Sequence, residues 1–380
     1  MEFNKFRSLC EVFEAPVVKQ EYDPKAKLAV KVDISLCTKE ERPRMISIIN
    51  RLAKSEAGRE TLEVAAADGV KFGFLDAATN CFGCSFGGIN CIGLGPRASD
   101  DKLVGTLCHE ARHAGQNVRM ANMPERYQLN VESIIRSSRA KEADAQAYAV
   151  KACKELEMQG DAGPLAAFAK FYPAIFAAYS KALAEQNGVM NDQVVVGTFK
   201  GWYDQTGTKQ NYEEGYIIDP MHDAIEQFNK GKTDDVYTFD KSVTSEEVVE
   251  KIGWTRKGNY LAAENPKFLD EERFISIGER TKKDAQDFFK IREEKTGIKA
   301  DKSVDSMPTH KDAFPRKLPE MGKPRGDVGP TMDLGDTIPR WNKILANKHK
   351  AKLNRAAETD KIEPSIAFSL AQRAVMNKGR

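Results

Sequence analysis

Residues 109–113 read His-Glu-Ala-Arg-His, and the sequence on either side of them predicts a helix. Ser99 can cap that helix, and the two aspartates that follow it interact favourably with the helix dipole. Apolar residues then recur at helical spacing, which extends the predicted helix over residues 100–121. Positions i and i+4 of a helix share one face, so His109 and His113 present both imidazoles on the same side.

Two histidines four apart, with a glutamate directly after the first, form the HExxH pattern of zinc peptidases. Imidazole nitrogen is a common zinc ligand, so His109 and His113 can hold one Zn²⁺ ion. Glu110 lies about 100° further round the helix and can act as general base toward a water molecule beside the metal. Residues 89–94 read as a strand closed by a Gly-Pro turn, and zincin domains use this strand-loop-helix order.

A catalytic zinc ion needs a third protein ligand, and two glutamates downstream are candidates. Residues 139–150 are rich in alanine and predict a helix whose small side chains allow close packing beside the first one, which favours Glu142. Glu132 is the alternative, because it stands 19 positions after His113, a spacing that some glutamate-zincins use. The charged surroundings of Glu132 read more like a solvated face. Asp144 lies about 200° round the helix from Glu142, so we expect it to face elsewhere.

Three stretches of the chain carry a resemblance to a known family, and together they fall within roughly residues 45–215. They are Cys108-His109-Glu110-Ala111-Arg112-His113-Ala114-Gly115-Gln116, Glu142-Ala143-Asp144-Ala145-Gln146-Ala147, and Phe199-Lys200-Gly201-Trp202-Tyr203 leading to Tyr212. The chain resembles an uncharacterised bacterial family of metallopeptidase domains within the glutamate-zincin (HExxH) class. In small zincins that cleave regulatory proteins, a similar glutamate-alanine helix supplies the third ligand. The resemblance therefore implies zinc held by His109, His113 and Glu142, with Glu110 as the catalytic base.

The implied reaction is hydrolysis of a peptide bond in a protein or peptide substrate. Zinc would lower the pKa of its bound water and polarise the substrate carbonyl, while Glu110 takes and later returns a proton. We expect strand 89–94 to be the sheet edge along which an extended peptide adds by backbone hydrogen bonds. The developing oxyanion needs a second electrophile besides the metal, and the candidates are Tyr212, Tyr203, Tyr148 and His222.

Length and composition set the outer bounds of the interpretation. A chain of 380 residues with 41% hydrophobic content can bury at least one sizeable core, and a net charge of +2 favours no particular class of partner. The N-terminus lacks the apolar stretch of a secretory signal, and no later stretch reaches the length of a membrane span. We therefore expect a cytoplasmic protein, although a specialised secretion machine or delivery inside a virus particle would leave the same sequence.

The cysteines suit a reducing compartment, because an odd number of them is scattered over the first half of the chain. Cys81, Cys84 and Cys91 could hold a structural zinc ion if a fourth ligand came from elsewhere, and the first two could form a redox pair. We favour buried thiols in a turn-rich hairpin, because there is no second CxxC motif and the glycines already explain the segment. The full set is Cys10, Cys37, Cys81, Cys84, Cys91, Cys108 and Cys153.

Composition changes along the chain predict five regions. The last forty residues carry nine Lys or Arg against three Asp or Glu, a net charge of +6. Such a tail suits an acidic partner such as nucleic acid, an acidic membrane or a partner helix, and a solvated helix pair or a secretion address explains it as well. The regions are an N-terminal segment (1–38), a zincin-like domain (39–230), a charged helical extension (231–298), a Pro-rich linker (299–339) and a basic helical tail (340–380).

These patterns predict an α+β fold that is mainly helical, with a small β-sheet before the HExxH helix and with C-terminal helical and linker regions. The leading function is zinc-dependent peptide hydrolysis. One rival is a catalytically inactive zincin-like binding module or particle component with a basic interaction tail. The other is a nucleic-acid-binding or scaffold protein in which the histidine pair is incidental, and zinc content distinguishes it from the first two.

Overall fold

The computed structural model describes residues 31–79, 81–231, 237–299, 301–315, 318–323 and 337–358. Most of the predicted N-terminal segment, parts of the predicted linker and residues 359–380 of the predicted tail lie outside the described residues. Within the described residues the protein is mainly helical with small sheets, which confirms the predicted α+β class.

A three-stranded sheet follows two N-terminal helices. Its strand order is β1-β3-β2, with β1 parallel and β2 antiparallel to β3. The prediction that strand 89–94 forms the sheet edge is therefore wrong, because β3 pairs on both sides and β2 is an edge among the described strands. The elements are α2 (Arg42–Leu52), α3 (Glu56–Ala67), β1 (Lys71–Phe74), β2 (Gly83–Phe86) and β3 (Cys91–Leu94).

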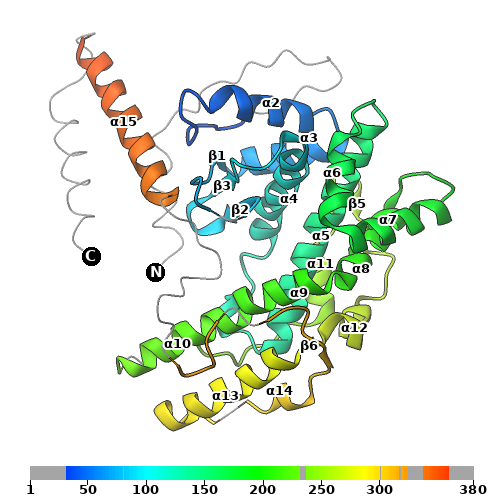
Figure 1. Cartoon of the computed structure of the whole chain (residues 1–380), viewed down its shortest axis with the longest axis vertical. Coiled ribbons are helices and arrows are strands. Elements are labelled where there is room, and N and C mark those ends of the chain that lie inside the picture. The colour runs from blue at the N-terminus through cyan, green and yellow to red at the C-terminus, as the bar shows by residue number, and fades with distance from the viewer. Residues whose placement is uncertain are drawn as a thin grey trace.

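Two long helices, α4 (Asp100–Arg119) and α5 (Val131–Glu157), run antiparallel through the centre of the molecule (Figure 1). Residues later in α4 contact residues earlier in α5, as expected for antiparallel helices. The thiol of Cys108 donates to the Tyr148 carbonyl at 3.8 Å, and the amide of Gln116 donates to the Lys141 carbonyl at 2.9 Å. Close approach is possible because α5 buries many alanines at the interface, as the small-residue pattern predicts.

Further helices follow α5 in the chain and build the larger apolar core together with it. Proline occupies the first turn of α6, α7 and α10, where its missing N–H group costs no helical hydrogen bond. A π-helical turn, η5 (Glu214–Ile218), interrupts the passage from α9 to α10, and such turns are frequent at functional sites. The helices are α6 (Gly163–Phe171), α7 (Pro173–Glu185), α8 (Asp192–Gly201), α9 (Thr206–Glu213) and α10 (Asp219–Asn229).

The region after residue 236 packs onto the same core, to which it contributes Phe268, Phe288 and Val304. Part of the stretch predicted as a linker is ordered, because β7 pairs with β6 in a parallel two-stranded sheet. Its elements are α11 (Ser245–Lys251), β4 (Trp254–Thr255), β5 (Gly258–Asn259), α12 (Glu272–Ile275), β6 (Ile277–Gly278), α13 (Glu279–Thr296), α14 (Ser303–Ser306) and β7 (Thr309–His310). The division into five regions stays a prediction.

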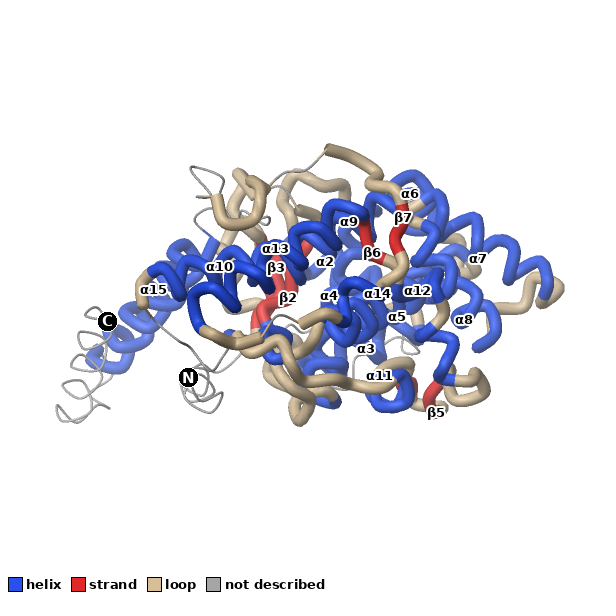
Figure 2. The backbone as a smooth tube through the Cα atoms, turned by 90° about the horizontal axis from the view of Figure 1, so that it is seen from below, coloured by secondary structure: helices blue, strands red, loops and turns tan. Residues whose placement is uncertain are grey.

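The first turn of α15 (Thr337–Glu358) binds the sheet. Trp341 is buried there, and its ring nitrogen donates to the carbonyl of Phe74 in β1 at 3.0 Å. Arg340 donates to the same carbonyl at 2.8 Å, and the hydroxyl of Thr337 accepts from the backbone of Asp76 at 2.8 Å. In Figure 2, α15 lies at the end of the molecule opposite α7.

Candidate metal centre

Helix α4 carries both histidines of the HExxH motif to the interior. Ser99 caps the helix, because its hydroxyl accepts from the backbone N–H of Lys102 at 3.3 Å. One turn separates His109 from His113, and both side chains are buried. Their Nε2 atoms lie 3.1 Å apart, so the two imidazoles point at one spot.

Glu142 of α5 faces both histidines, with Oε2 near His109 and Oε1 near His113. Its carboxylate oxygens lie 3.2 Å from Nε2 of His109 and 3.5 Å from Nε2 of His113. A tetrahedral zinc ion with bonds of about 2.0–2.2 Å holds its ligand atoms roughly 3.3–3.5 Å apart, and the separations found here lie close to that range. Oε2 of Glu142 is also buried without a well-formed hydrogen bond to any described residue, which suits an atom that binds a cation.

Glu110 is the other acidic group near the histidines. It can place a donor atom within 4.8 Å of both imidazoles, so proximity alone would also allow it as a ligand. Glu142 is the stronger candidate, because its carboxylate oxygens come within 3.5 Å of both Nε2 atoms. Burial would raise the pKa of Glu142, but the imidazoles of His113 and His109 together outweigh this effect and hold the pKa well below its usual value.

The structure does not bring Glu132 to the histidines. Glu132 lies in the first turn of α5, ten residues before Glu142, which is about 15 Å along the helix axis. Its carboxylate pairs with Arg136, which also donates to Asp270 at 3.0 Å. Glu132 therefore belongs to a partly exposed ion-pair cluster, as its charged neighbours in the sequence suggest.

Gln116 determines which ring nitrogen of His113 carries the proton. Its amide nitrogen donates to the Lys141 carbonyl at 2.9 Å and to the Asp144 carboxylate at 2.6 Å, and both groups can only accept. The carbonyl oxygen of Gln116 therefore faces Nδ1 of His113, at 2.6 Å, and accepts its proton. With the proton on Nδ1, Nε2 of His113 keeps the free lone pair that a metal ligand needs.

Asp144 anchors a buried network behind Gln116. Arg112 donates to both of its oxygens, at 2.9 and 3.0 Å, and the hydroxyl of Tyr260 donates to Oδ1 at 2.8 Å. The carboxylate is 0% exposed. Burial would raise the pKa of Asp144, but the charge of Arg112 and the hydrogen bonds outweigh it, so the pKa lies below its usual value. Asp144 thus stays ionised in the interior.

Two tyrosines on α9 and η5 border the metal centre. Tyr216 donates a hydrogen bond to Oε1 of Glu142 at 2.7 Å, and its ring lies 5.2 Å from that of Tyr212. Tyr212 is one of the oxyanion candidates from the sequence. Tyr216 is not among them, because it lies in a π-helical turn that helical spacing does not predict. Burial raises the pKa of both hydroxyls well above the usual value, so both stay protonated donors.

The other oxyanion candidates make contacts elsewhere. Tyr148 donates to Glu60 of α3, and Tyr203 packs edge-to-face against Trp202 with ring centroids 5.1 Å apart. His222 is buried in α10. Among the tyrosines, the structure therefore places Tyr212 and Tyr216 beside Glu142.

Glu110 is buried between α4 and strand β2. Burial raises the pKa of Glu110 above its usual value, and the neighbouring imidazoles offset this effect only in part. A raised pKa makes a carboxylate a stronger base, which favours transfer of a proton to it. Gly83 of β2 lies directly against it, because a Cβ there would be 3.0 Å from Oε1 of Glu110 and 2.6 Å from the methyl group of Thr106. The edge strand therefore runs beside the predicted base.

A model for a known family covers this site. The model, described as "Putative metallopeptidase family (DUF6782)", matches residues 26–230, more than half of the chain. The chain belongs to this family. The match confirms the resemblance inferred from the motifs. No curated protein and no solved structure matches the chain.

The match to the metallopeptidase family spans the HExxH helix, Glu142 and Tyr216, whereas Tyr260 and α15 lie beyond its C-terminal limit. Among the described residues, the grouped metal-binding side chains are those of the motif, and Cys81, Cys84 and Cys91 form no such group. Cys91 is instead buried against Leu75 and Trp341. None of the helices in the described ranges combines the length and apolar character needed to span a membrane.

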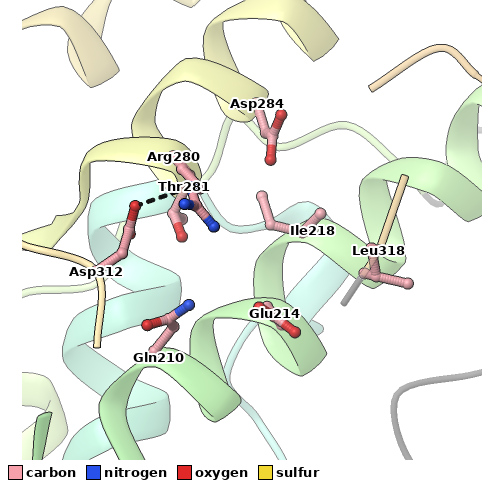
Figure 3. A pocket seen from close by; sticks show the side chains of 8 residues that line it. All are labelled: Gln210, Glu214, Ile218, Arg280, Thr281, Asp284, Asp312 and Leu318. Atoms are coloured by element: carbon pink, nitrogen blue, oxygen red, sulfur yellow. Dashed lines mark ion pairs between the residues drawn. The ribbon is translucent and has the colours of Figure 1, made fainter. Parts of the chain in front are cut away.

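A pocket lies on another face of η5, away from the predicted site residues of this metallopeptidase family member (Figure 3). Glu214 and Ile218 of η5 line it, while Tyr216, two residues from each, contacts Glu142. Arg280 and Asp312 form an ion pair of 3.2 Å across it. The remaining lining residues are Gln210, Thr281, Asp284 and Leu318.

Proposed function

We propose that the chain is a zinc-dependent peptidase that hydrolyses peptide bonds, with His109, His113 and Glu142 as metal ligands. The observation that carries the proposal is a buried cluster of donor atoms. The two Nε2 atoms lie 3.1 Å apart, Oε2 of Glu142 lies 3.2 Å from Nε2 of His109, and Oε1 lies 3.5 Å from Nε2 of His113. Membership of a metallopeptidase family supports a hydrolase. Zinc is the metal we propose, because two imidazoles and one carboxylate form a common catalytic zinc set that leaves one position open.

In this proposal Glu110 is the general base. Bound zinc would acidify a water molecule and polarise the substrate carbonyl. Glu110 accepts the proton of the attacking water and returns it to the nitrogen of the leaving amine. Tyr216 holds Glu142 in position through its hydrogen bond of 2.7 Å, and Gln116 holds His113 through one of 2.6 Å.

The free edge of β2 is the proposed binding site for an extended peptide. Strand β2 pairs with β3 on one side, and no other pairing of it is found among the described strands. Gly83 brings this edge against Glu110, so a peptide that adds to β2 by backbone hydrogen bonds would place a peptide bond near the base. Because backbone pairing does not depend on side-chain identity, peptide binding at this edge would need little side-chain selectivity.

The first experiment measures metal content. Protein purified without added chelator is expected to hold one zinc ion per chain, and a His109→Ala/His113→Ala double variant is expected to hold none, because two of three ligands are gone. Elemental analysis gives the metal-to-protein ratio. A metal-free wild-type protein that also fails to take up zinc on titration would refute the proposal.

The choice between the two glutamates is tested by metal affinity. Glu142→Ala is expected to weaken zinc binding by roughly 100-fold or more, because losing a ligand costs at least as much as losing a supporting residue. Glu132→Ala is the matched control on the same helix, and its affinity is expected to stay within about twofold of wild type. Competition with a chromophoric chelator measures both. The reverse ranking would make Glu132 the third ligand.

A further inference from the structure

Tyr260 lies outside the family-matched region, yet it contacts Asp144 in the buried network behind the metal centre. It directly follows β5, the second strand of the short β4–β5 hairpin, and its backbone N–H donates to the Gly253 carbonyl at 3.0 Å. The hairpin is fixed to α3, because the backbone N–H of Arg256 donates to Glu60 at 3.0 Å. Tyr260 is 4% exposed, so its hydroxyl is held inside the protein.

A continuous series of hydrogen bonds leads from this hydroxyl to His113. Tyr260 donates to Asp144 at 2.8 Å, Asp144 accepts from Gln116 at 2.6 Å, and Gln116 lies 2.6 Å from Nδ1 of His113. We propose that Tyr260 is a positioning residue for the metal centre, which holds Asp144 so that Gln116 presents its carbonyl oxygen to His113. This inference rests on the proposed metal site but not on the proposed hydrolysis.

The hydroxyl of Tyr260 gives the two oxygens of Asp144 an equal number of hydrogen-bond donors. Each oxygen of Asp144 accepts two hydrogen bonds: Oδ1 from Arg112 and Tyr260, and Oδ2 from Arg112 and Gln116. Without the hydroxyl, Oδ1 keeps only the Arg112 donor and the carboxylate turns toward the guanidinium. Oδ2 then moves relative to Gln116, and the amide that orients His113 loses its fixed partner.

The test removes the hydroxyl alone. Tyr260→Phe is expected to weaken zinc binding by about 3- to 10-fold, less than the roughly 10- to 100-fold typical of a direct supporting residue, because Tyr260 acts through two intermediates. Tyr203→Phe is the matched control, since that tyrosine is also buried and its hydroxyl has no hydrogen-bond partner among the described residues. The zinc affinity of the control is expected to equal that of wild type.

A double-mutant cycle separates positioning from general stability. In a Gln116→Leu background, Tyr260→Phe is expected to change zinc affinity by less than about twofold, because the connection to His113 is already broken. A structural role would instead lower the melting temperature of the metal-free protein and leave the two effects on affinity additive.

The outcomes distinguish this inference from the proposed function. Zinc affinity of Tyr260→Phe equal to wild type, or full additivity with Gln116→Leu, would overturn the positioning role while leaving the metal site intact. A wild-type protein that binds no zinc would overturn both. Weaker binding in Tyr260→Phe that disappears in the Gln116→Leu background supports the inference.

Discussion

Replacing Glu110 by glutamine is expected to lower peptide hydrolysis by about 10²- to 10⁴-fold while leaving zinc content unchanged. The amide has almost the same shape as the carboxylate, but it cannot accept a proton from water. The metal should remain, because the proposed ligands are His109, His113 and Glu142. Cleavage of a peptide library, followed by mass spectrometry, together with elemental analysis, measures both quantities.

Glu132→Gln is the control for this experiment, because it makes the same chemical change in a glutamate that pairs with Arg136 away from the histidines. Its activity is expected to match wild type. Turnover by Glu110→Gln at the wild-type rate would exclude Glu110 as the base. A wild-type protein that holds zinc but cleaves no peptide would instead support the inactive zincin-like binding module.

Replacing Arg112 by methionine is expected to lower the free energy of unfolding of the metal-free protein by about 3–5 kcal/mol. The cause is Asp144, which is 0% exposed and would lose the one cation among the described residues that donates to it. A buried carboxylate without a charged partner costs far more than the lost attraction between two exposed groups. Denaturant unfolding, followed by circular dichroism, gives the free energy.

Arg273→Met is the matched control for that change. Arg273 pairs with Asp204 at 2.8 Å, close to the 2.9 Å between Arg112 and Asp144. The side chains of Arg273 and Asp204, however, are each about half exposed. Its removal is expected to change stability by no more than about 1 kcal/mol. Equal losses in the two variants would show that the interior around Asp144 is well hydrated.

The sequence predicts the parts of the site that depend on local spacing. The i, i+4 histidines and the Ser99 cap specify the helix and the shared face of His109 and His113, because both follow from helix geometry alone. The alanine-rich stretch around Glu142 indicates close helix packing, and the structure places Glu142 against both imidazoles. These inferences needed no knowledge of tertiary structure.

The parts that depend on distant pairing could not be predicted. The sequence predicts residues 89–94 as an edge strand, but a strand sequence does not show which neighbours it pairs with, and β3 is paired on both sides. Tyr216 contacts Glu142 from a π-helical turn, and helical spacing alone does not predict such a turn. Tyr260 meets Asp144 across 116 positions of sequence, and no local pattern marks that contact.

The binding of α15 to the sheet has a consequence for recombinant expression. Gly73 and Gly93 leave a slot in the sheet for the indole of Trp341, since a Cβ at either position would come within 3.1 Å of that ring. A fragment that ends at residue 230, where the family match stops, would open this slot and its apolar lining to water. Such a fragment would tend to self-associate, so the family match and the smallest soluble unit have different boundaries.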